Sequence, residues 1–130
     1  DGCIVTGKTS PLLGASAALL LNALKHMAGI DHKLELIPAS VIEPISAMKT
    51  DYLGHRNPRL HSDEVLIALA ISGLTNPLAA LVQEQLKKLR GCEAHFSVII
   101  SEEDAKLYKR LGINVSCEPR YEVKSLYHKK

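Results

Sequence analysis

Two kinds of hydrophobic pattern alternate along the 130-residue chain. Short β-branched or alternating runs predict four strands, at Cys3–Thr6, Lys33–Ile37, Ala94–Ile100 and Ile113–Cys117. Runs with helical spacing predict five helices, over residues 11–28, 40–48, 63–72, 77–90 and 102–111. The resulting order β-α-β-α-α-α-β-α-β predicts an α/β fold. We expect a three-layer α-β-α domain with a largely parallel or mixed sheet of about four strands.

Residues typical of helix ends flank the predicted helices. Ser10 and Pro11 are typical of a helix start, because a serine side chain accepts a free backbone N–H and proline lacks one. Gly29 is typical of the residue that follows a helix. Ser62 and Ser101 are expected to cap two later helices, whose first turns carry the acidic residues favoured by the helix dipole. The first helix is apolar around most of its circumference, which predicts that it is buried on several sides.

The composition narrows the classes of function. A hydrophobic content of 46% is typical of a globular protein, whereas a formal net charge of +2, one Phe and no Trp argue against a nucleic-acid-binding surface. The longest apolar run, near Ala15–Leu21, is too short to cross a membrane. Three widely spaced cysteines and the absence of a secretory leader predict a reduced, cytoplasmic protein. We expect residues 1–118 to form a single domain cut from a longer chain, and residues 119–130 an extended tail.

The letters Gly2-Cys3-Ile4-Val5-Thr6-Gly7-Lys8-Thr9 match the phosphate-binding pattern G-x-x-x-x-G-K-T. In a true nucleotide-hydrolysing loop the strand ends before the first glycine, but here the intervening residues form the predicted strand themselves. A weaker hypothesis survives: Gly7, Lys8, Thr9 and Ser10 join a strand to a helix start, where backbone N–H groups attract anions. The alternative is that Gly7 only makes a turn, Ser10 only caps the helix and Lys8 is solvated.

A second polar segment runs from Asp51 to His61 and contains two arginines and two histidines. Arg56 and Arg59 are candidates to clamp a carboxylate or phosphate, because guanidinium groups form paired hydrogen bonds with such groups. His61 is a further candidate ligand-binding residue, and either it or His55 has the chemistry of an acid or base. The alternative is a surface loop with ordinary solvated charges.

Several enzyme signatures are missing. The sequence contains no H-E-x-x-H, no paired H-x-E and P-C-x-x-C, and no G-x-S-x-G motif. No cysteine and histidine pair has a spacing typical of a zinc site, so we predict no metal. Cys92 and His95 are a candidate thiol and base, although strand alternation is able to place them on opposite faces. Catalysis, cofactor and substrate therefore stay open.

Four stretches together resemble a known family: residues 5–15 (Val-Thr-Gly-Lys-Thr-Ser-Pro-Leu-Leu-Gly-Ala), 49–55 (Lys-Thr-Asp-Tyr-Leu-Gly-His), 57–61 (Asn-Pro-Arg-Leu-His) and 89–95 (Leu-Arg-Gly-Cys-Glu-Ala-His). They are similar to the C-terminal region of a family of large bacterial conserved hypothetical proteins, classed as a domain of unknown function. The resemblance covers nearly the whole chain and implies a three-layer α-β-α domain grouped with cytidine deaminases. Some genomes label members ATP-dependent zinc proteases, but the protease and deaminase motifs are both missing here.

These observations lead to two hypotheses of different classes. The first is a partial binding domain for a phosphate-bearing or other anionic small ligand, formed by Gly7, Lys8, Thr9 and Ser10 with Arg56, Arg59 and His61. The alternative is a structural domain that docks through its apolar helices against the remainder of its own longer chain or a second copy. Neither hypothesis involves nucleic acid or a membrane.

Overall fold

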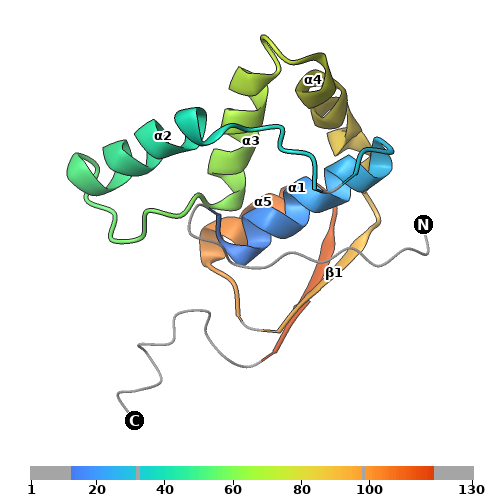
Figure 1. Cartoon of the computed structure of the whole chain (residues 1–130). Helices are drawn as coiled ribbons and strands as arrows, with labels where there is room; N and C mark the ends of the chain where they lie inside the picture. The colour runs from blue at the N-terminus through green and yellow to red at the C-terminus, as the bar shows by residue number, and fades with distance from the viewer. Residues whose placement is uncertain (1–12, 32, 98, 119–130) are drawn as a thin grey trace. The chain divides into compact units, whose positions relative to one another are not determined.

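The computed structural model describes residues 13–31, 33–97 and 99–118 (Figure 1). The chain divides into two compact units, residues 1–88 and residues 89–130. In chain order the elements are α1 (Ala15–Met27), α2 (Ala39–Asp51), α3 (Ser62–Ser72), α4 (Pro77–Gln83), a 3-10 helix η1 (Glu84–Leu89), β1 (Glu93–Phe96), α5 (Glu102–Arg110) and β2 (Asn114–Cys117). The described residues therefore form a mixed α/β structure, as predicted.

The first unit is helical. Helix α1 packs against α3 and α4, which also contact each other, and α2 packs against α3. Leu24, Val65, Leu69 and Val82 are fully buried between these helices. Each such side chain contributes about 1.5–3 kcal/mol relative to an exposed position. The expectation that the first helix is buried on several sides is consistent with these contacts.

The second unit contains a two-stranded parallel sheet. Glu93 of β1 lies opposite Asn114 of β2, and the register continues to Phe96 opposite Cys117. Helix α5 packs against β2, and the rings of Phe96 and Tyr108 meet edge-to-face with centroids 5.5 Å apart. These two strands overlap the predicted strands at 94–100 and 113–117, although β1 ends at Phe96, and their parallel pairing agrees with the expected largely parallel or mixed sheet.

Two helix ends follow the predicted signals. The Ser101 side chain accepts a hydrogen bond from the Asp104 N–H and so caps α5. Gly29 follows α1 with a φ of +73°, a conformation that glycine adopts more easily than other residues. His61, however, is the residue that precedes α3, and Ser62 is its first helical residue. Helix α2 is longer than predicted, and the predicted helix over 77–90 is split into α4 and η1.

Two further predictions are wrong. The first helix begins at Ala15 rather than at Pro11, because Leu13 makes a parallel backbone bridge with Leu60 and Gly14 is still extended. Residues 33–37 form a turn rather than a strand. Their backbone bonds locally, since the N–H groups of Lys33 and Leu34 both donate to Asp31. The predicted strand Cys3–Thr6 and the tail 119–130 lie outside the described residues. The single domain over 1–118 stays a prediction.

Candidate functional site

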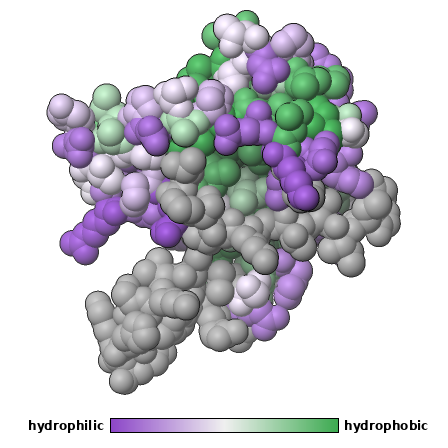
Figure 2. Space-filling view, in the orientation of Figure 1, coloured by the Kyte–Doolittle hydropathy of each residue, from purple (hydrophilic) through white to green (hydrophobic). Residues whose placement is uncertain are grey.

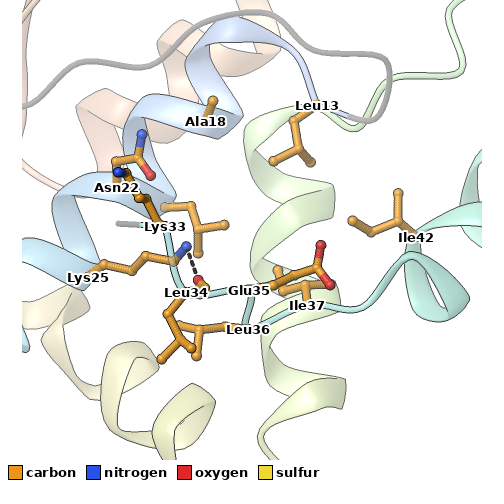
Figure 3. Close-up of a pocket in the computed structure, with 11 residues that line it drawn as sticks. Leu13, Ala18, Asn22, Lys25, Lys33, Leu34, Glu35, Leu36, Ile37 and Ile42 are labelled. Carbon is orange, nitrogen blue, oxygen red and sulfur yellow. Dashed lines mark hydrogen bonds between the residues drawn. The ribbon is translucent and has the colours of Figure 1, made fainter. Parts of the chain in front are cut away.

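A cavity of about 240 Å³ lies in the first unit, between α1, the turn at residues 33–37 and the start of α2. Figure 3 shows Leu13 and Ile42 on one side of it, and Lys25, Asn22 and Lys33 on the other. The floor is mainly apolar. The full lining is Leu13, Ala18, Leu21, Asn22, Lys25, Lys33, Leu34, Glu35, Leu36, Ile37 and Ile42. An apolar hollow with a few polar groups at its edge is the usual form of a small-molecule site.

Lys25 is the unusual member of this lining. Its side chain is only 5% exposed, and the Nζ atom donates a hydrogen bond of 2.6 Å to the Leu34 carbonyl oxygen. Burial lowers the pKa of the Lys25 ammonium group, and the nearby carboxylates of Glu35 and Asp31 oppose that effect. The sequence did not mark this lysine, because it occupies an ordinary position near the end of a helix. Its burial depends on the turn that closes over it.

A second polar cluster connects α2, the following loop and α3. The Lys49 Nζ atom, 2% exposed, donates to the Arg59 carbonyl oxygen at 2.7 Å and to Glu64 Oε1 at 2.6 Å. The same Glu64 oxygen accepts the His61 N–H at 2.8 Å. Lys49 therefore anchors the segment between α2 and α3, which carries Arg56 and Arg59. Sequence reasoning missed Lys49 as well, since its partners lie 10 and 15 residues away.

The predicted site residues fall into two groups. Gly7, Lys8, Thr9 and Ser10 lie outside the described residues. Arg56 is exposed, while Arg59 and His61 are partly buried, and His61 serves as the N-terminal boundary residue of α3. The second group lies beside the start of α1, because Leu13 bridges Leu60 and the Gly14 N–H donates to the Leu60 carbonyl at 3.1 Å. Leu13 also lines the cavity.

In the second unit, His95 has different neighbours from those that the sequence suggested. Its Nδ1 atom lies 2.7 Å from Ser116 Oγ, and its Nε2 atom lies 3.1 Å from Glu118 Oε2. Cys92 precedes β1 and is partly buried. Within residues 13–31, 33–97 and 99–118, no group of three or more His, Cys, Asp or Glu side chains is arranged to hold a metal ion. Over the same ranges, every helix is too short or too polar to cross a membrane.

A family model described as "Domain of unknown function DUF1846, C-terminal" matches residues 1–127. The chain belongs to this family. Its relatives include the UPF0371 protein CE2832 of Corynebacterium efficiens, 53% identical over 130 residues, and a UPF0371 protein of Streptococcus thermophilus, 50% identical over 129 residues. The matches cover 100% and 99% of this chain but only 26% of each relative. The predicted resemblance is thus confirmed.

The DUF1846 C-terminal domain therefore corresponds to about the last quarter of the longer bacterial proteins that it matches. The shared region includes the whole of both compact units. In relatives of that length, the rest of the chain is about three times as long as this domain.

Proposed function

We propose that this DUF1846 C-terminal domain supplies part of a binding site for a phosphate-bearing or other anionic small ligand. The binding residues would be Gly7, Lys8, Thr9 and Ser10 on one segment and Arg56, Arg59 and His61 on another. The observation that carries the proposal is the backbone bridge between Leu13 and Leu60. It joins two segments that are more than forty residues apart in the sequence.

The covalent geometry of the chain makes the bridge informative. Ser10 lies three positions before Leu13 in the sequence, and a chain of three residues spans at most about 11 Å. Arg59 and His61 are the immediate neighbours of Leu60. The bridge therefore limits how far Ser10 is able to lie from Arg59 and His61, which supports the proposed two-sided recognition of an anion.

The late start of α1 changes the expected source of attraction. Because the helix begins at Ala15, its N-terminal dipole acts at Gly14 rather than at Ser10. The proposal therefore relies more on Lys8 and the two arginines than on helix N–H groups. Lys49 and Glu64 support the site indirectly, because they anchor the backbone on either side of Leu60. In this proposal the longer chain completes the site and the domain is cytoplasmic. The three-layer α-β-α arrangement is part of the proposal, without a strand at residues 33–37.

The experiment is a ligand screen on the full-length protein. Inorganic phosphate, a nucleotide and a sugar phosphate should raise the melting temperature, since a ligand that binds the folded state stabilises it. The double variant Arg56→Ala/Arg59→Ala should lose that response. The matched control Lys106→Ala/Arg110→Ala removes two exposed cations from α5 and should retain it. An equal response in both variants would refute the arginine clamp.

A second candidate function rests on an exposed apolar surface. Ile67 and Ile71 of α3, Leu74 of the following turn, and Leu78 and Leu81 of α4 are between 41% and 84% exposed. Figure 2 shows hydrophobic surface over the α3 and α4 region. Contiguous apolar surface of this kind is typical of an interaction site. We propose that the remaining part of the longer chain covers it, because about three quarters of each relative lies outside this domain.

Hydrogen exchange tests this docking directly. In the full-length protein, Leu74→Glu should increase exchange across residues 67–81, because it introduces a charge into a buried contact. The control Leu53→Glu, at another exposed leucine, should leave exchange there unchanged. Self-association abolished by Leu74→Glu would instead indicate a second copy as the occupant.

A further inference from the structure

We infer that Ser116, His95 and Glu118 form a nucleophile, base and carboxylate relay that attacks activated acyl esters. This site lies wholly within the second unit and is independent of the proposed anion site. Ser116 and His95 are direct partners in the register of β1 and β2, and Glu118 follows β2 by one residue. The three side chains therefore lie on two adjacent, paired strands and the residue that follows the second strand.

The sheet itself gives the cluster its position. Successive side chains of a strand point to opposite faces. Phe96 is buried against Tyr108 of α5, so its neighbour His95 belongs to the face away from that ring. Ser116, which pairs with His95, shares that face. All three polar side chains lie near the carboxyl ends of two parallel strands, the edge at which open α/β sheets bind ligands.

The hydrogen bonds favour one tautomer of a neutral His95 ring. An ionised carboxylate only accepts hydrogen bonds, so Nε2 carries the proton that points to Glu118 Oε2 at 3.1 Å. In the neutral ring, Nδ1 is then an acceptor, and the Ser116 hydroxyl donates to it across 2.7 Å. Serine activated by an adjacent base, which is oriented by a third group, is the arrangement that nucleophilic catalysis requires.

The chemistry follows from this arrangement. His95 Nδ1 takes the hydroxyl proton as Ser116 Oγ attacks the ester carbonyl carbon, and the proton then passes to the departing alcohol. Water, deprotonated by His95, attacks the acyl-serine and releases the acid, which restores the serine hydroxyl. The sum is one ester and one water converted to one acid and one alcohol. Ser116 and His95 would be catalytic residues, and Glu118 a positioning residue.

Exposure is consistent with access to a substrate. The His95 side chain is 60% exposed and that of Glu118 is 47% exposed. The sheet face that carries the three side chains is polar, and the opposite face packs on α5. The three side chains are therefore not part of the hydrophobic core. General-base assistance by a positioned histidine contributes about 10²–10⁴ in rate. We therefore expect measurable acylation of small activated esters.

The test is covalent labelling of the full-length protein by a fluorophosphonate probe, with the modified residue located by peptide mass spectrometry. The serine oxygen attacks phosphorus and fluoride leaves, so a stable adduct records the activated hydroxyl. Ser116 should be labelled in the folded protein and not after heat denaturation. Ser116→Ala should remove the adduct, whereas Ser40→Ala, at an exposed serine on α2, should leave it.

Two further variants separate catalysis from mere exposure. His95→Ala should slow labelling of Ser116 by about 100-fold, in line with the loss of a general base. Glu118→Gln should slow it by about 10-fold and change the pH profile, because an amide does not select the same histidine tautomer. Absence of a Ser116 adduct, or labelling unaffected by His95→Ala, would overturn the inference.

Discussion

The Lys49–Glu64 pair permits a quantitative prediction about the segment that carries Arg56 and Arg59. Lys49→Met keeps most of the aliphatic stem but removes the ammonium group that bonds both Glu64 and the Arg59 carbonyl. Removing one partner of a buried pair costs about 3–5 kcal/mol. Glu64 is 20% exposed, so water reduces the cost of leaving it unpaired. We expect Lys49→Met to lower the free energy of unfolding by about 2–4 kcal/mol.

The partner variant is milder for a structural reason. Glu64→Gln retains an oxygen that is able to accept from both Lys49 and the His61 N–H, so only the charge is lost. A hydrogen bond to a charged group contributes about 1.5–3 kcal/mol, and a neutral one about 1 kcal/mol. The expected cost is therefore about 1–2 kcal/mol. The double variant should cost less than the sum of the single variants, because both remove the same interaction.

Urea denaturation followed by circular dichroism measures these differences, and hydrogen exchange over residues 39–72 assigns them to the first unit. The control Lys87→Met removes an exposed lysine of η1 and should change stability by less than about 0.5 kcal/mol. A Lys49→Met variant as stable as this control, with unchanged exchange in α3, would refute the reasoning. The ion pair would then contribute little to the stability of the loop.

Three other predictions concern pH and backbone geometry. Burial, with a smaller contribution from Asp104, raises the pKa of Tyr108 above 10.0. The free energy of unfolding should therefore fall by about 1.4 kcal/mol per pH unit once the unfolded tyrosine ionises. Tyr108→Phe should remove this slope, whereas Tyr52→Phe, at an exposed tyrosine, should not. The lowered pKa of Lys25 has the opposite effect on stability, because below pH 10.5 the unfolded lysine binds more protons than the folded one. The wild type should therefore gain stability relative to Lys25→Met as the pH rises toward 10.5. Gly112→Ala should destabilise the second unit by about 1–3 kcal/mol in urea, since φ is +83° and a Cβ atom would lie 2.8 Å from Arg90 Cγ. A stability equal to that of the wild type would refute both the backbone strain and the clash.

Local sequence signals predicted several elements of the fold, whereas contacts between distant residues were not predictable from the sequence. Ser101, Gly29 and the parallel strands β1 and β2 were predicted from neighbouring residues, because caps and β-branched runs act within a few positions. The turn at residues 33–37 was predicted as a strand. Its alternating pattern indicated a half-buried segment but carried no information about a partner strand.

The candidate sites show the same division. Sequence alone indicated the family, the mixed α/β class and the basic loop with Arg56 and Arg59. Tertiary structure decided that Leu13 pairs with Leu60, which moved the start of α1 to Ala15. It also buried Lys49 against Glu64 and placed His95 beside Ser116, contacts that span 15 and 21 residues. Such contacts depend on how elements pack in space, and a linear pattern specifies only which side of each element is apolar.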